Sequence, residues 1–164
     1  MLPDTATTGD CLLVHGHSVV QRAIQEATRS PFCHAAMLVR TAVGLLVAET
    51  VEGVGFQSMT LDDWLAGRPG EDIFYGKAPG VVRDNPAITT RLQRYTDPAA
   101  RRYDYGALAT VWLSWVTGRT FPEDGEVCSL FVADMWAACG YVIPGNAAPG
   151  SFLYFCESLS HMAR

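Results

Sequence analysis

Two apolar segments joined by a short connection constrain the fold more than any other feature of this chain. Residues 34–39 read HAAMLV and residues 45–50 read LLVAET, with Gly44 in the connection between them. Two such runs separated by a short turn predict an antiparallel β-hairpin. Because both runs are apolar, the hairpin must pack against other elements rather than stand alone.

In the rest of the chain, glycines, prolines and helix-capping residues divide the apolar runs and predict a mixture of short strands and helices. Residues 11–14 (CLLV) predict a first strand, and Ser18 is a good N-cap for a helix that should end before Pro31. Helices are also expected after Thr60, after Asn85, over residues 107–116 and over residues 127–139, and strands around residues 54–57 and 72–83. This order indicates an α+β fold with helices packed on an antiparallel sheet.

Size and charge restrict the classes of protein that the chain can belong to. Its 164 residues suit a single domain over residues 1–164, and 49% hydrophobic with 18% charged residues argues against disorder. The net charge is -5 and no basic stripe is present, so a nucleic-acid partner is not expected. Oligomeric state is not predicted.

The N-terminus and the apolar runs of the chain predict where the protein acts. The polar N-terminus lacks the basic region of a signal peptide, and residues 107–116 are too few to span a bilayer. No transmembrane segment is therefore expected. The chain is expected to act in the cytoplasm, or to be delivered without a signal peptide in a phage particle or by a secretion system.

Five cysteines are spread widely along the chain, without a C-x-x-C motif. This pattern favours free thiols in a reducing compartment over a disulfide framework. Cys128 falls in the first turn of a predicted helix, where the helix dipole and free N–H groups would stabilise a thiolate. Cys33 adjoins His34, but adjacent strand residues point to opposite faces, so it cannot easily pair with this histidine. The other three are expected in the core: Cys11, Cys139 and Cys156.

His34 opens the first strand of the hairpin, which raises the question of what lies beside it. An even-length turn places Glu49 on the same face, whereas an odd-length turn presents Thr50 or Glu52. A carboxylate there could orient the imidazole and fix its tautomer.

Several segments in this order are similar to the circularly permuted branch of the NlpC-type papain-like cysteine peptidases, and in particular to the YiiX-like family. They are GDCLLV, SPFCHAAMLV, VAETVEGVGF, RRYDYGAL and EVCSLFVADMWAACGY. The resemblance implies a permuted papain-like fold in a bacterial or phage protein. It implies Cys128 as nucleophile, His34 as general base and acid, and Glu49 as the orienting residue. The chain departs from the family at Leu130, where Glu is frequent, and at Cys33, where Ser or Tyr is frequent.

The implied reaction is acyl transfer from an amide or ester to a cysteine thiolate, followed by hydrolysis. Backbone N–H groups at the start of the Cys128 helix are candidates for holding the oxyanion. The resemblance implies a peptide or amide substrate derived from the cell wall, a peptidoglycan stem peptide first, and no metal or organic cofactor. Five further residues are candidates for the substrate cleft: Asp10, His17, Tyr103, Tyr105 and Ser129.

Three other interpretations compete with this one. His15 and His17 could bind a metal together with His34, but no acid or cysteine at a suitable spacing supports such a site. Lecithin:retinol acyltransferase-like enzymes share the His-before-Cys order, so a lipid thioesterase or acyltransferase is the enzymatic alternative. The non-enzymatic alternative is an inactive papain-like module, used for binding or as a structural component of a phage particle.

Overall fold

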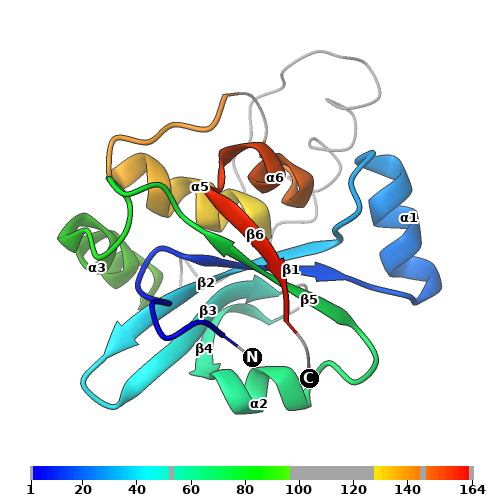
Figure 1. The fold of residues 1–164 in the computed structure, drawn as a ribbon, viewed down its shortest axis with the longest axis horizontal. Coiled ribbons are helices and arrows are strands. Elements are labelled where there is room, and N and C mark those ends of the chain that lie inside the picture. The colour runs from blue at the N-terminus through cyan, green and yellow to red at the C-terminus, as the bar shows by residue number, and fades with distance from the viewer. Residues whose placement is uncertain (1, 52–53, 97–127, 145–146, 163–164) are drawn as a thin grey trace.

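The computed structural model describes residues 2–51, 54–96, 128–144 and 147–162. These residues form an antiparallel sheet of six strands in the order β4-β3-β2-β1-β5-β6, with helices around it (Figure 1). The strands are β1 (Cys11–His15), β2 (His34–Thr41), β3 (Gly44–Val51), β4 (Gly55–Thr60), β5 (Asp72–Lys77) and β6 (Ser158–His161). The helices are α1 (Val19–Ala27), α2 (Leu61–Ala66), α3 (Pro86–Leu92), α5 (Cys128–Ala138) and α6 (Phe152–Phe155). The architecture is thus α+β, as the sequence predicts.

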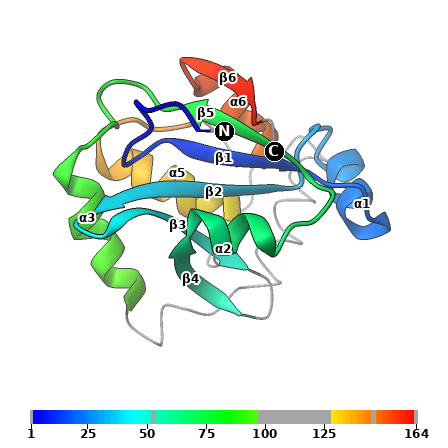
Figure 2. The ribbon, with the colours of Figure 1, turned by 60° about the horizontal axis from the view of Figure 1, so that its bottom comes forward.

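Both faces of the central strands are buried, which explains their nearly continuous apolar sequences. On one face, Leu13 and Met37 belong to a core that includes residues of α5 and Phe152 of α6. On the other face, Leu12 and Leu38 pack in a second core with Trp64 of α2. Figures 1 and 2 show α5 and α2 on opposite sides of the sheet.

The hairpin formed by β2 and β3 has an even-length turn. Thr41 pairs with Gly44 and Met37 with Ala48, so a two-residue turn joins the strands. This register is the even-length case, in which Glu49 shares a face with His34. Thr50 points to the opposite face, and Glu52 lies outside the described residues.

The helix boundaries follow the predicted caps. Ser18 accepts a hydrogen bond from the Gln21 backbone and completes a capping box at the start of α1. Thr60 caps α2 in the same way, and Gly67 ends that helix. None of the helices in the described ranges is long and apolar enough to cross a membrane. The helix predicted over residues 107–116 lies outside the described residues.

The sheet differs from the sequence prediction at its edge. Residues 72–83, expected to give one or two strands, contain the single strand β5 followed by turns. The short segment Ser158–His161 pairs with β5 as β6, a strand that no apolar pattern in the sequence predicts. This strand is polar and mostly exposed, so its structure comes from backbone pairing rather than from an apolar pattern.

Candidate active site

Cys128 begins helix α5 and is almost completely buried, with 8% of its surface exposed. The helix is fixed on the sheet by apolar residues of its next turns, including Phe131, Val132 and Trp136. At this position, the groups that act on the Cys128 thiol, by charge or as donors, are the His34 ring and the backbone N–H groups of Ala35 and Ser129. The start of α5 therefore meets the start of β2 at the thiol.

His34 connects this thiol to a carboxylate. Its Nε2 atom lies 2.7 Å from Oε2 of Glu49, whose side chain is completely buried. Because Glu49 occupies Nε2, Nδ1 is the ring nitrogen left to contact the Cys128 thiol. The three residues therefore form a chain of contacts from sulfur to imidazole to carboxylate.

The carboxylate of Glu49 accepts hydrogen bonds from residues of two further elements. Gln57, directly opposite on β4, donates to Oε1 at 2.7 Å. Trp64 of α2 donates its indole N–H to Oε2 at 2.7 Å, and Arg68 donates to both oxygens at 3.1 and 2.8 Å. Every oxygen of this buried carboxylate is thus satisfied, as its burial requires.

These partners determine the charge of Glu49. Burial raises the pKa of its carboxyl, but the hydrogen bond and positive charge of His34 outweigh burial, assisted by Arg68 and Trp64. The pKa of Glu49 falls to about 2 as a result. Glu49 is therefore a carboxylate at any pH near neutrality.

The same contacts favour an ion pair between His34 and Cys128. Burial lowers the pKa of His34, but the charge and hydrogen bond of Cys128, together with Glu49, raise this pKa well above its ordinary value. Burial opposes the thiolate of Cys128, yet the positive charge of His34 and the N–H donors of Ala35 and Ser129 lower the thiol pKa. A thiolate beside an imidazolium is the reactive form of a cysteine nucleophile.

The competing cysteines have the opposite tendency. Burial raises the pKa of Cys33 to about 11, and its sulfur donates to the carbonyl oxygen of Val14 at 3.4 Å. Two causes raise the pKa of Cys11 well above its ordinary value: the hydrogen bond to Cys156 is the larger, and burial is the second. Burial also raises the pKa of Cys139. By contrast, the surroundings of Cys128 lower its thiol pKa.

Two of the expected cleft residues are buried instead. Asp10 is fully buried and accepts hydrogen bonds from Tyr75, Arg83 and the backbone of Ala78. It therefore joins β1 to β5 and to the segment after β5, which corrects the expectation that it lines a cleft. Ser129 is 2% exposed and contributes its backbone N–H to the Cys128 sulfur rather than an accessible hydroxyl.

The other expected cleft residues lie elsewhere. His17 is half-exposed and contacts Asp72 at the start of β5, 3.1 Å from its carboxylate, rather than His34. Tyr103 and Tyr105 lie outside the described residues.

Sequence reasoning missed the residues that surround Glu49. Gln57 could have been found, because a strand was expected there and antiparallel pairing places it across from Glu49. Trp64 and Arg68 gave no signal, since nothing local to α2 indicates that this helix folds back over β3. Only the tertiary arrangement brings them to the carboxylate.

The fold and this set of contacts describe an α+β protein in which a cysteine at the start of a helix, a histidine and a buried glutamate meet. No protein-family model matches the sequence, and no curated protein matches it. Among solved structures, the chain is similar to the crystal structure of metalloprotein YiiX from Escherichia coli O157:H7, DUF1105. The two share 17% sequence identity, the match covers 97% of each chain, and the TM-score is 0.68. The likeness to YiiX is a likeness of fold.

Proposed function

We propose that this protein is a cysteine hydrolase that cleaves an amide or peptide bond through Cys128, His34 and Glu49. The observation that carries the proposal is the continuous contact from the Cys128 sulfur through His34 to the ionised, buried Glu49. A nucleophile, a base and a group that orients the base are the elements that covalent acyl transfer needs. The fold is taken to be the permuted papain-like one that the sequence resemblance implies.

The proposed reaction begins with proton transfer from the thiol of Cys128 to His34. The thiolate attacks the substrate carbonyl carbon, and a carbon–sulfur bond forms as the carbonyl electrons move to oxygen. In this proposal, backbone N–H groups at the start of α5 stabilise the oxyanion. His34 then donates its proton to the leaving nitrogen, and the carbon–nitrogen bond breaks.

Hydrolysis of the acyl-enzyme uses the same groups in reverse. His34 takes a proton from a water molecule, the resulting hydroxide attacks the thioester carbon, and the carbon–sulfur bond breaks. Cys128 leaves as a thiolate and the acid product is released. Throughout the cycle, Glu49 holds His34 by its Nε2 atom and stabilises the imidazolium.

YiiX, which this chain resembles in fold, is a metalloprotein, which raises the question of a metal at this site. The donor set does not fit one. Glu49 already accepts hydrogen bonds on both oxygens, and the cation that pairs with this carboxylate is the guanidinium of Arg68. No step of the proposed reaction is therefore assigned to a metal.

The substrate class proposed first is a peptidoglycan stem peptide, following the sequence resemblance. The test compares wild type, Cys128→Ala and the matched control Cys33→Ala on purified muropeptides and on model acyl esters, with products identified by mass spectrometry. Peptide cleavage by wild type and Cys33→Ala, but not by Cys128→Ala, supports the proposal. Turnover of esters alone would favour the lipid acyltransferase alternative. Activity in none of them, with no covalent adduct on Cys128, would favour the inactive module.

A further inference from the structure

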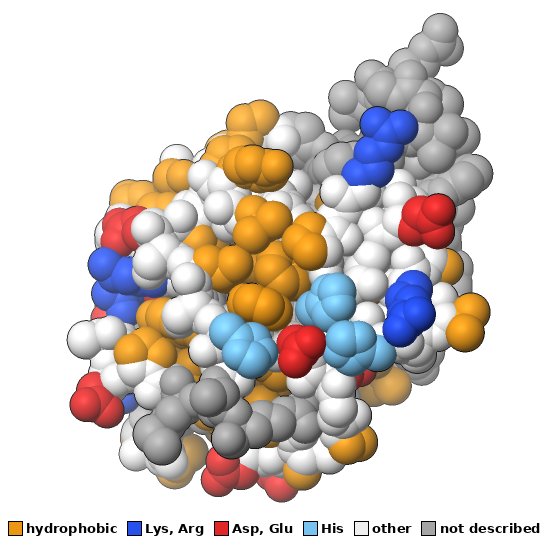
Figure 3. Space-filling model, turned by 45° about the vertical axis from the view of Figure 1, so that its right-hand side comes forward, with side chains coloured by type: hydrophobic (Ala, Val, Ile, Leu, Met, Phe, Trp, Pro, Cys, Tyr) orange, Lys and Arg blue, Asp and Glu red, His pale blue; other side chains and the backbone are white. Residues whose placement is uncertain are grey.

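A second cluster of chemically active side chains lies outside the candidate active site. His15 ends β1, His17 follows it in the turn before α1, Asp72 begins β5, and His161 ends β6. On the surface, histidine side chains gather around an acidic side chain (Figure 3). The proposed hydrolase reaction uses none of these residues.

Strand register explains why the cluster forms. His15 and Asp72 are direct cross-strand partners, and Phe74 is the partner of His161. Because alternate residues share a face, Asp72 and Phe74 point the same way, and so do their partners. Three adjacent strands therefore place His15, Asp72 and His161 on one face, although they are far apart in sequence.

The distances are those of a set of potential metal ligands. One ligand atom each from His15, His17 and Asp72 lies within 4.8 Å of the others. A tetrahedral zinc site with bonds of 2.0–2.1 Å needs ligand atoms about 3.4 Å apart. His17 and Asp72 already satisfy this, at 3.1 Å. Both side chains are nearly half exposed, so a small movement can bring the third ligand into range.

The contacts of His15 leave one ring nitrogen available for a metal. Its Nδ1 atom lies 2.6 Å from the carbonyl oxygen of Pro31, which can only accept a hydrogen bond. The amide nitrogen of Gln25 is farther from Nδ1, at 3.1 Å, and itself donates to the same carbonyl at 2.9 Å. The proton of His15 is therefore on Nδ1, and Nε2 keeps a free lone pair. Metal-bound histidines are commonly held in this way by a carbonyl on the other nitrogen.

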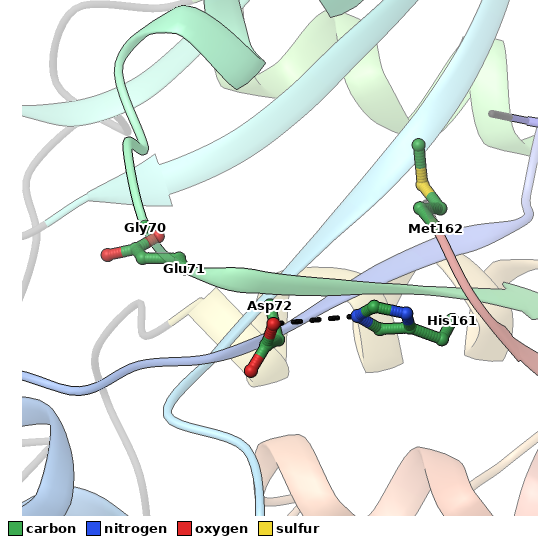
Figure 4. A pocket seen from close by; sticks show the side chains of 5 residues that line it. All are labelled: Gly70, Glu71, Asp72, His161 and Met162. Atoms are coloured by element: carbon green, nitrogen blue, oxygen red, sulfur yellow. Dashed lines mark ion pairs between the residues drawn. The ribbon is translucent and has the colours of Figure 1, made fainter. Parts of the chain in front are cut away.

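The other oxygen of Asp72 has its own partner. His161 Nε2 lies 3.5 Å from Oδ1 (Figure 4). His17 contacts the other oxygen, Oδ2. A hollow of about 250 Å³ adjoins this pair and is lined by residues 70–72 together with His161 and Met162. This space can hold a water molecule as a further ligand. His161 then acts from outside the ligand set and orients the carboxylate.

We propose that His15, His17 and Asp72 bind a zinc ion, with a water molecule in the fourth position. Two neutral imidazoles and one carboxylate are the ligands of many zinc sites, whereas magnesium and calcium prefer oxygen ligands alone. A single carboxylate partly neutralises the ion, and the solvent-exposed position allows entry. Zinc bound here joins β1, the turn before α1, and β5.

The test measures zinc binding to the full chain in a Cys128→Ser background, which removes the thiolate as a competing ligand. Equilibrium dialysis with metal analysis should give one zinc ion per chain, at a dissociation constant in the micromolar range or below. Asp72→Ala and His17→Ala should each weaken binding at least 100-fold. His161→Ala, which removes an outer partner only, should weaken it about 10-fold.

Glu157→Gln is the matched control, because Glu157 is similarly exposed but pairs with Lys77 away from the cluster. Its zinc affinity should equal that of the parent. Zinc should also raise the melting temperature of the parent and of Glu157→Gln but not of Asp72→Ala, since only a site in the folded state gives this shift. Absence of saturable binding, or binding that survives both Asp72→Ala and His17→Ala, would overturn the proposal. Either result leaves the proposed hydrolase untouched.

Discussion

Arg68 donates from Nη2 to both carboxylate oxygens of Glu49, at 3.1 and 2.8 Å. Its guanidinium carbon also lies 3.9 Å from the centre of the Trp64 ring, and Trp64 donates to the same carboxylate. Trp64 of helix α2 and Arg68, two residues beyond its end, thus hold the group that orients His34. The candidate active site depends on both faces of the sheet, with Cys128 supplied from one and the support of Glu49 from the other.

Replacing Arg68 tests this dependence. Arg68→Gln leaves a buried carboxylate without its permanent cation, which should lower the free energy of unfolding by about 3 kcal/mol. The rate of the proposed hydrolysis should fall as well, because the orientation of His34 loosens. Arg68→Lys keeps the charge but lacks the planar guanidinium that stacks on Trp64, so its effects should be intermediate. Urea unfolding and turnover measure the two effects.

The matched control is Arg22→Gln, because Arg22 is exposed on α1. This variant should change stability by less than about 0.5 kcal/mol and leave activity as in wild type. If Arg68→Gln behaved like Arg22→Gln, the interpretation of the Glu49 contacts would be wrong.

Thiol reactivity tests the lowered pKa of Cys128 without any knowledge of the substrate. The thiolate is the reacting species, so lowering the thiol pKa extends alkylation to lower pH. At pH 6, iodoacetamide should modify Cys128 before Cys33, whose pKa is raised to about 11. His34→Gln removes the positive charge and should slow the labelling of Cys128 at least 10-fold. Peptide mapping by mass spectrometry gives the order of modification.

Cys33→Ala should leave the pH profile of Cys128 labelling unchanged. Labelling of Cys33 ahead of Cys128 would contradict the assignment of the nucleophile.

The sequence predicted the elements that carry the site better than it predicted the support around them. The turn between β2 and β3 has two residues, an even number, so strand alternation puts Glu49 on the same face as His34. Strand alternation is a local rule, which a sequence can reveal. The contacts of Trp64 and Arg68 depend on how α2 folds back on β3, which no local pattern encodes. The same limit applies to Asp72, whose proximity to His15 follows from the pairing of β1 with β5. An acid 55 residues beyond His17 gave no spacing signal, although the structure places it 3.1 Å away.

The lowered pKa of Glu49 predicts a specific loss of stability in acid. A carboxyl whose pKa falls on folding, here from 4.5 to about 2, stabilises the folded state above pH 4.5. This contribution should disappear as the pH falls from 4.5 towards 2, where the folded state also takes up the proton. For a fully buried group the loss is on the order of 3 kcal/mol. Urea unfolding of wild type at pH 7, 4.5 and 3 should show it.

Glu49→Gln separates this contribution from that of the other carboxylates. The variant should be less stable than wild type at pH 7 and should lose less stability between pH 4.5 and 3. Equal slopes for the two proteins across this range would mean that Glu49 has an ordinary pKa when folded.

Gly76 provides a test of packing at the opposite side of the sheet from α2. It pairs with Cys11 on β1 and with Leu159 on β6. A Cβ atom at this position would lie 2.6 Å from the Cys11 sulfur and 2.7 Å from the Cys156 sulfur, closer than real Cβ contacts allow. Gly76→Ala should therefore lower the free energy of unfolding by about 1–3 kcal/mol through overpacking.

Two further variants identify the cause of that loss. Gly67→Ala is the control, because its nearest neighbours would be backbone oxygens at 3.6 and 3.7 Å and the glycine has a negative φ. It should be tolerated. In the double variant Cys11→Ala with Gly76→Ala, the new methyl group occupies space that the sulfur vacates. The double variant should consequently be more stable than the sum of the two single changes predicts. Additive effects would show that removing the Cys11 sulfur does not relieve the overpacking, which would then come from the Cys156 sulfur.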